Sequence, residues 1–291
     1  MEDALKVQNL SKKIGKKSII SNISFDVKYG ETVGIVGING AGKTSILKCL
    51  CGLWTKYEGK IFVNGFDFKD KPNECLFCMG TMIENPSLFP NMTLKQNIEY
   101  FGAFCTYDYQ SRINLFLDFL KLDVFYNKKV RTFSTGMKQK ACLLIVLMKK
   151  PSILLLDEPT SMLDPLSAEE IRIFLNYIKE KEKVSTLICS HNLVEIEDLC
   201  DKVIIIDKGK IIENIEINNN CTKLYKFEFA NENIAKQTYK QSKEYETVLQ
   251  GKNIFLRANV TNLKKYITEE NPDFTNLSTD GNLQRIFSSL I

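Results

Sequence analysis

The stretch TVGIVGINGAGKTS occupies residues 32–45 and indicates the architecture of the chain. Residues 32–36 are almost all apolar and predict a buried strand. A glycine-rich turn follows at 37–42, and from Lys43 onward apolar residues recur at helical spacing: Ile46, Leu47, Leu50 and Leu53. A strand, a glycine-rich turn and a helix in this order, with the spacing GxxxxGK and then Ser or Thr, predict a loop that binds phosphate groups.

The chemistry of such a loop fits a nucleotide. Glycines let the backbone turn tightly around phosphate oxygens, and N–H groups at the helix start attract the anion together with the helix dipole. Lys43 would reach the outer phosphates, and the Thr44 hydroxyl would hold Mg²⁺. The alternative is a glycine-rich turn that binds nothing. The predicted nucleotide-binding residues of this loop are Gly37, Ile38, Asn39, Gly40, Ala41, Gly42, Lys43, Thr44 and Ser45.

Two acidic residues end a second apolar strand, ILLLDE at 153–158. The carboxyl ends of parallel strands face the crevice in which α/β proteins bind ligands. Asp157 would therefore support the Mg²⁺ shell, and Glu158 would polarise the attacking water. A solvated strand end is the simpler interpretation of a single acid, but hydrolysis needs a metal anchor and a base together.

The composition of the 291 residues, 44% hydrophobic and 25% charged, is that of a globular protein. A net charge of +4 without a long basic block gives no indication of nucleic acid binding. The longest apolar runs fall well short of the roughly 20 residues that a membrane-spanning helix needs. The first residues, MEDALKVQNL, lack the features of a secretory signal, so we expect a cytosolic chain.

Nine cysteines lie scattered through apolar segments, which fits reduced thiols better than a disulfide framework. Cys75 and Cys78 form a CxxC pair, which permits a metal or redox site. The chain has a single histidine and no second cysteine pair nearby, so buried or idle thiols are favoured.

Apolar strands alternate with helical segments along the first three quarters of the chain. Further strands are predicted at 5–9, 23–27, 152–156 and 184–189, a helix at 165–181, and a hairpin of 203–207 with 210–215. This alternation predicts the α/β class with a largely parallel sheet. Residues 85–150 predict an inserted helical lobe. NNNC at 218–221 marks a linker to a small α+β tail with strands at 224–229 and 253–258 and helices at 233–245 and 263–270.

The run FSTGMKQ at 133–139 resembles the signature motif of the ABC ATPase family, most commonly LSGGQ. Ser134 and Gly136 would offer a hydroxyl and an N–H group to an anion at a helix start, although such residues also form ordinary caps. Asp164 ends SMLD at 161–164, which resembles the D-loop of this family, and His191 matches its switch histidine. The order of these motifs favours the family over chance.

The resemblance covers about residues 4–215 and implies a P-loop NTPase of the ABC type with ATP and Mg²⁺ as cofactors. Its nucleotide-binding domain would span 1–217, with the helical lobe at about 85–150, and a small accessory domain would span 221–291. Two cassettes of this family pack head to tail, with ATP between the phosphate loop of one and the signature of the other. Lys43, Glu158 and His191 would be catalytic, while Ser134, Thr135, Gly136 and Asp164 would complete the nucleotide site.

The resemblance also implies partners. The cassette would lie on the cytoplasmic face of the cell membrane, bound to separate transmembrane permease subunits and paired with a second cassette, most simply a copy of itself. In this family a short permease helix enters the groove beside the helical lobe. Residues 85–104, NPSLFPNMTLKQNIEYFGAF, offer aromatic side chains for such a contact, although a place in the core is the safer interpretation of each one alone.

Three positions depart from the family pattern. Glu84 stands where most members carry a glutamine, and its carboxylate would still bind Mg²⁺. The same substitution resembles that of cassettes from peptide-antibiotic export and lantibiotic self-protection. The alternative is a variation without functional effect. Ile14 falls where an aromatic residue usually stacks on adenine, so GTP would serve beside ATP. Thr135 replaces a usual glycine and adds bulk to the signature.

The sequence therefore predicts the ATP-hydrolysing subunit of an ABC transporter that exports a small hydrophobic or peptide antibiotic. The tail at 221–291 has a weaker resemblance to the extra domain of bacitracin-resistance and lantibiotic-immunity cassettes. One alternative is a soluble ABC ATPase that acts on ribosomes or DNA, but such proteins usually carry two cassettes or a long coiled-coil insertion. A third, a non-hydrolytic binding module, is disfavoured by Glu158 and His191.

Overall fold

The structure is a computed structural model that describes residues 3–84, 88–105, 108–217, 223–241, 247–258, 266 and 276–280. The chain forms two compact units, Met1–Ile215 and Glu216–Ile291, and each has a hydrophobic core of its own. The linker predicted at 218–221 and nearly all of the helix predicted at 263–270 lie outside the described residues.

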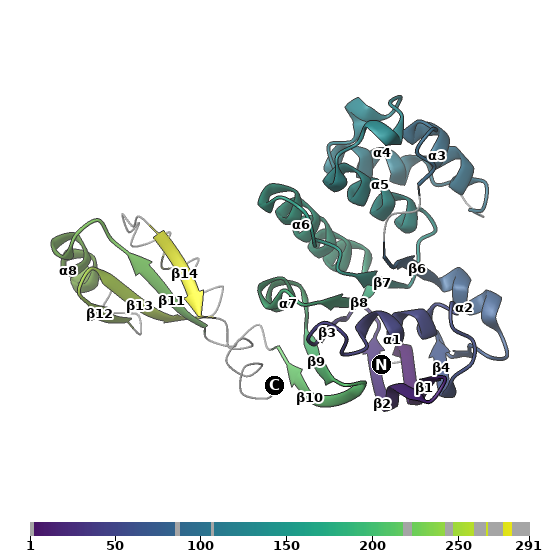
Figure 1. Ribbon diagram of the computed structural model, residues 1–291. Helices are drawn as coiled ribbons and strands as arrows, with labels where there is room; N and C mark the ends of the chain where they lie inside the picture. Colours follow the sequence, from purple (N-terminus) through teal and green to yellow (C-terminus); the bar gives the residue numbers. More distant parts are fainter. Residues whose placement is uncertain are drawn as a thin grey trace. The chain divides into compact units, whose positions relative to one another are not determined.

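A six-stranded sheet runs through the first unit in the order β10-β9-β3-β8-β7-β6 (Figure 1). Strand β3 pairs in parallel with β8 and β9, and β7 pairs in parallel with β6 and β8. The predicted mostly parallel sheet is therefore confirmed, and the carboxyl ends of these strands meet at one edge. The strands are β3 (Thr32–Val36), β6 (Met79–Met82), β7 (Ile153–Asp157), β8 (Ser185–Ser190), β9 (Lys202–Asp207) and β10 (Lys210–Glu216).

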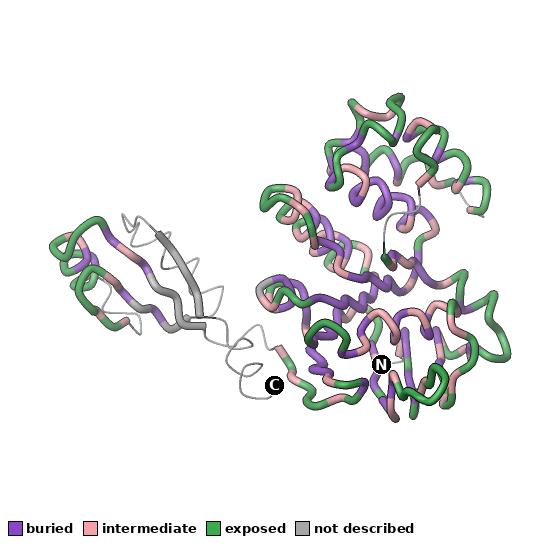
Figure 2. Tube along the Cα trace, in the orientation of Figure 1, coloured by how far each residue is buried: buried purple, intermediate pink, exposed green. Residues whose placement is uncertain are grey.

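The middle strands of this sheet are apolar because both of their faces are covered. Every residue of β3, β7 and β8 is buried (Figure 2). Helix α1 (Lys43–Leu50) packs on β7, and helix α7 (Leu193–Leu199) packs on β3 and β8. A strand that is covered on both sides needs no alternation of polar and apolar residues. The long helix α6 (Pro165–Glu182) packs against α7.

A smaller antiparallel sheet has the order β2-β1-β4-β5 and shares one hydrophobic cluster with the parallel sheet. Its strands are β1 (Asp3–Ile14), β2 (Lys17–Lys28), β4 (Glu58–Val63) and β5 (Phe66–Asp67). Helix α2 (Pro72–Cys78) follows β5 and places Cys75 in the core, where its thiol donates to the Phe66 carbonyl. The sequence did not predict β4, β5, α2 or β6, because these elements are short and, unlike β3 and β7, do not form a continuous apolar run.

The region between β6 and β7 forms a helical lobe, in agreement with its periodicity. It contains α3 (Leu94–Gly102), α4 (Gln110–Phe119), α5 (Thr135–Met148) and two 3₁₀ turns, Asp123–Phe125 and Val130–Thr132. A capping box between Thr93 and Gln96 fixes the start of α3. The lobe is anchored on α6, where Phe116 meets Phe174 edge to face at 5.1 Å and Arg112 forms an ion pair with Glu182.

The second unit is a small antiparallel sheet in the order β12-β13-β11-β14 with one described helix, α8 (Glu232–Gln241). Its strands are β11 (Lys223–Glu228), β12 (Thr247–Gln250), β13 (Asn253–Ala258) and β14 (Asn276–Asp280). Its core holds Phe227, Phe229, Ala235, Ile254, Leu256 and Tyr266. The strands predicted at 224–229 and 253–258 are confirmed, whereas β12 and β14 were not predicted.

The hairpin between β9 and β10 holds the phosphate loop in place. Its two turn residues, Lys208 and Gly209, both have positive φ angles, which suits a two-residue turn between strands. The Gly209 N–H donates to the Ala41 carbonyl at 2.8 Å, and the Gly209 carbonyl accepts from the Ser21 N–H at 2.8 Å. A Cβ atom on Gly209 would lie 2.2 Å from the Ile19 carbonyl oxygen.

The substitution Gly209→Ala should lower the free energy of unfolding by about 2–4 kcal/mol, because it combines a strained φ with a backbone clash. Urea unfolding followed by circular dichroism would measure the loss. The matched control is Gly15→Ala, which has a similar φ of 58° but no heavy atom within 4 Å. It should cost only about 1–2 kcal/mol. Equal losses for the two variants would contradict the role assigned to Gly209.

Candidate nucleotide site

The phosphate loop lies between β3 and α1 and lines a cavity of about 370 Å³. Gly37 packs so tightly that a Cβ atom there would lie 2.5 Å from the Ile206 carbonyl oxygen. Gly40 and Gly42 adopt positive φ angles of 86° and 114°, which glycine takes without strain. Helix α1 begins at the cavity and has no acidic residue in its first turn, so no acid of the helix itself offsets the positive end of its dipole.

Lys43 is the first residue of α1 and is nearly buried. Its ammonium group folds back over the loop and donates to the carbonyl oxygen of Gly37 at 2.6 Å. The side chain is thereby held against the loop that lines the cavity. From this position the Lys43 ammonium group can turn toward a phosphate bound in the loop by a change of side-chain rotamer alone.

Asp157 ends β7 beside α1, where it is 8% exposed. Burial raises the pKa of Asp157 and the Glu158 charge adds to this, while the Thr44 hydroxyl and the Lys43 charge oppose the shift. The buried Asp157 Oδ1 has no hydrogen-bond partner within the protein. A buried oxygen without a partner beside a threonine hydroxyl suits a hard cation such as Mg²⁺, which needs only one or two protein oxygens when phosphate supplies others.

Glu158 and His191 meet at the carboxyl edge of the sheet. His191 Nδ1 lies 2.8 Å from Glu158 Oε2, and the His191 N–H points at the same oxygen over 3.4 Å. Glu158 has a φ of 49°, which is uncommon for a residue other than glycine. Two hydrogen bonds hold this conformation: the Glu158 N–H donates to the Cys189 carbonyl at 2.8 Å, and the Ser161 hydroxyl donates to the Glu158 carbonyl at 2.9 Å. Glu158 also lines the phosphate cavity.

Glu84 follows β6 and forms an ion pair with Lys48 of α1, with 2.5 Å between the ammonium nitrogen and Oε1. Its side chain is 61% exposed, and its charge contributes to the raised pKa of Asp157. Lys48 also lies 5.7 Å from the centre of the Trp54 ring, and Lys12 lies 5.4 Å from it. Lys48 was not predicted from the sequence, although it lies one helical turn after Thr44 and therefore on the same face of α1.

The signature residues lie at the start of α5 and do not line the phosphate cavity of their own chain. The Ser134 hydroxyl caps α5 by accepting from the Met137 N–H at 3.2 Å. Gly136 lies so close to α6 that a Cβ atom would approach the Ser167 hydroxyl to 2.8 Å. Asp164 caps α6. Within the chain these residues therefore act as helix caps and close contacts, and Thr135 begins α5.

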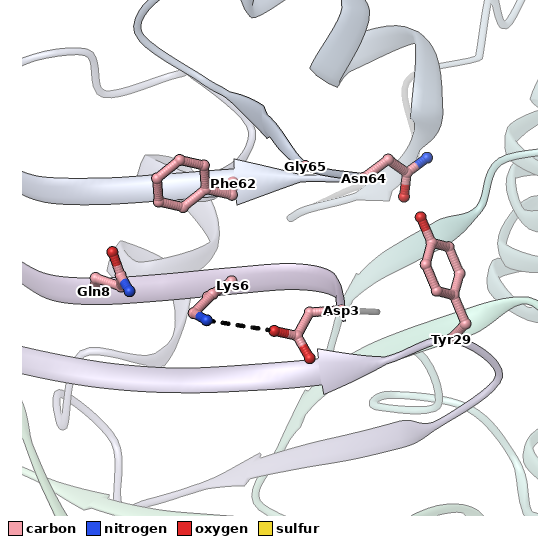
Figure 3. A pocket seen from close by; sticks show the side chains of 7 residues that line it. All are labelled: Asp3, Lys6, Gln8, Tyr29, Phe62, Asn64 and Gly65. Carbon is pink, nitrogen blue, oxygen red and sulfur yellow. Dashed lines mark ion pairs between the residues drawn. The ribbon is translucent and has the colours of Figure 1, made fainter. Parts of the chain in front are cut away.

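Ile14 ends β1, is 51% exposed, and does not belong to the cavity lining. Ile19 lines the cavity instead and was not predicted. A separate hollow of about 470 Å³ lies on the antiparallel sheet and contains none of the predicted site residues (Figure 3). Its charged residues, Lys6 and Asp3, form an ion pair at 3.7 Å.

Residues 20–161 match the family described as ABC transporter. The bacitracin transport ATP-binding protein BcrA of Bacillus licheniformis is 32% identical over 238 residues, which cover 81% of this chain and 78% of BcrA. The chain belongs to the ABC transporter ATP-binding family. A second relative of this cassette is the lantibiotic transport ATP-binding protein SrtF of Streptococcus pyogenes, 36% identical over 72% of this chain and 89% of SrtF.

The dimeric structure of the ATP-binding cassette MJ0796 in a post-hydrolysis state, bound to ADP and Pi, has the same fold. It matches with a TM-score of 0.64 at 24% identity, over 74% of this chain and 99% of that one. ABC cassettes are ATPases, so this chain is the ATP-binding and ATP-hydrolysing subunit of an ABC transporter. Subunits of this family dimerise and associate with the membrane through permease partners. In the described part of the chain, no helix combines the length and apolar character needed to cross a bilayer.

The substitution Asp157→Asn should make the protein more stable. Because the pKa of Asp157 is raised in the fold, its ionised form costs stability at every pH above that pKa. We expect a melting temperature higher by roughly 2–4 °C at pH 7, the effect of about 1 kcal/mol in a domain of this size. The gain should shrink as the pH falls toward 4, the ordinary pKa of aspartate, because the native carboxyl then takes up its proton.

Differential scanning calorimetry at several pH values would measure this gain. The control is Asp118→Asn, which removes an exposed carboxylate from α4 and should leave the melting temperature within about 1 °C. A lower melting temperature for Asp157→Asn at pH 7 would show that the ionised carboxylate stabilises the fold.

Proposed function

We propose that this cassette energises the export of a peptide antibiotic through separate permease subunits. The observation that carries the proposal is Glu84, whose carboxylate replaces the usual glutamine beside the phosphate loop and pairs with Lys48. The replacement resembles that of cassettes from peptide-antibiotic export and lantibiotic self-protection systems. Two relatives, named for bacitracin and lantibiotic transport, support the same substrate class.

The residues at the sheet edge would divide the work of hydrolysis. The phosphate loop would bind the nucleotide phosphates, and Lys43 would turn from the Gly37 carbonyl toward them. Glu158 would orient the attacking water, and His191 would hold the Glu158 carboxylate in place. Thr44, Asp157 and Glu84 would hold Mg²⁺, which neutralises phosphate charge when bound. Glu84 must release Lys48 for that role.

A second cassette would complete the site. Ser134, Thr135 and Gly136 do not line the cavity of their own chain, so a partner would have to present them. The dimeric form of the structural relative supports such a pair. With Ile14 in place of an aromatic residue, adenine would lose a stacking partner, and GTP would compete with ATP.

The permease would dock on an aromatic cluster at α3, defined as Phe89, Tyr100, Phe101 and Phe104. Tyr100 is at the centre of the cluster, with ring centroids 4.8 Å from Phe89, 5.3 Å from Phe101 and 5.8 Å from Phe104. Phe104 is 60% exposed and Tyr100 is 45% exposed. Exposed aromatic rings of this kind contribute strongly when they become buried in an interface.

The first test is to identify what binds the cassette in cells. A tagged Glu158→Gln variant should hydrolyse ATP at least about 100-fold more slowly and should therefore stay paired around ATP. Purified with ATP from detergent-solubilised native membranes, it should retain a multi-helix permease, and cells that carry it should lose resistance to a peptide antibiotic. Recovery of ribosomes or DNA-associated proteins without a permease would instead support the soluble alternative.

A second test concerns the docking surface. Phe104→Ala should weaken permease retention by about 10-fold or more, because an exposed aromatic anchor loses its interface contacts. It should change the melting temperature by no more than about 2 °C, because the ring is exposed. The matched control is Val124→Ala, which removes a 67% exposed apolar side chain elsewhere on the helical lobe. Equal retention of the permease by both variants would place the docking surface elsewhere.

A further inference from the structure

Glu195 is a buried carboxylate that the nucleotide site does not use directly. It lies on α7 and is 1% exposed. Its Oε1 accepts the Thr160 hydroxyl at 2.8 Å, and its Oε2 accepts the Ser190 hydroxyl at 2.7 Å. Burial raises the pKa of Glu195, so the charged group costs the fold stability. A group that is kept at such a cost calls for a functional explanation.

The two hydroxyls lie beside the catalytic pair, one in the turn after β7 and one at the last residue of β8. Thr160 stands two residues after Glu158, and Ser190 stands directly before His191. The Ser190 hydroxyl oxygen also accepts the Asn192 N–H at 3.0 Å. The Glu195 carboxylate is therefore a bridge between the end of β7 and the end of β8, on the buried side of the contact between Glu158 and His191.

We propose that Glu195 is a positioning residue, which sets the 2.8 Å contact between Glu158 and His191 by joining Thr160 to Ser190. Glu158 has a positive φ, and a residue keeps such a conformation only when its surroundings fix it. The bridge from Thr160 is one of those constraints. Without this hydrogen bond, the loop after Glu158 would change conformation, and the Glu158 carboxylate would move away from the His191 imidazole.

The same bridge also reaches the helix that carries the signature. Gln139 of α5 is nearly buried, and its side-chain amide donates to the Pro159 carbonyl at 3.0 Å. Pro159 lies between Glu158 and Thr160. A continuous set of bonds thus leads from α5 through the loop at 158–160 to Glu195 and then to Ser190 beside His191.

The inference rests on the proposed roles of Glu158 and His191, but not on the exported substrate. The simpler alternative is that Glu195 only anchors α7 to the core. The two can be separated because the chain has a single histidine, so its imidazole ¹⁵N signals come from His191 alone. These signals report the bond to Glu158 without any turnover.

The test uses the full-length chain with Glu195→Gln, Thr160→Val and Thr160→Ser, at one protein concentration and one pH. In Glu195→Gln and Thr160→Val we expect kcat for ATP to fall by about 10- to 100-fold while KM changes less than about twofold. The His191 Nδ1 signal should move toward that of a free imidazole. Thr160→Ser keeps the hydroxyl and should restore both values to within about threefold.

The matched control is Asp198→Asn, which removes an exposed carboxylate three residues further along α7 and should leave kcat and the His191 signal unchanged. Wild-type kcat and His191 signals in Glu195→Gln and Thr160→Val would overturn the inference. The inference would also be overturned if the melting temperature and kcat both fell, KM changed with them, and Thr160→Ser restored none of the three. That result would mean that Glu195 only anchors α7 to the core. Glu158→Gln is measured alongside to test the proposed catalytic roles separately. If Glu158 is not catalytic, kcat will stay high in Glu158→Gln whatever the other variants show.

Discussion

The parallel register of β3, β7 and β8 is the constraint on which the nucleotide site depends. Val36 pairs with Ser190 and Asp157 pairs with Cys189, so all three strands end within a residue of one another. The Glu158 N–H bond to the Cys189 carbonyl carries this alignment one residue beyond β7. Because the side chains that follow these strands emerge at one edge, a slip of one residue would reverse their faces and separate Glu158 from His191.

Local sequence was sufficient to predict the elements that build this edge. The strands β3, β7 and β8 each contain a short apolar run, and the phosphate loop has a fixed spacing, so both are visible without tertiary information. Contacts between distant segments were not predictable in this way. The ion pair between Lys48 and Glu84 and the bonds of Glu195 to Thr160 and Ser190 join residues whose proximity only the folded chain creates.

Several features of the site that serve the proposed function lower the stability of the fold. Asp157 and Glu195 are acids with raised pKa values, and Glu158 has an uncommon backbone conformation. Each of these features costs free energy of folding, and the cost is offset by the apolar cluster that joins the two sheets and α1. The carboxyl edge thus combines two buried acids with an uncommon backbone conformation at the place where the nucleotide would bind.

Trp54 gives the cassette an optical sensor of its own. It is the single tryptophan of the chain, and the ammonium groups of Lys12 and Lys48 lie within 6 Å of its ring. Indole emission depends on nearby charge, and Lys48 is the partner of Glu84. Any movement of Glu84 away from α1 would therefore change the emission of the unlabelled protein, which allows the state of this loop to be followed in real time during a catalytic cycle.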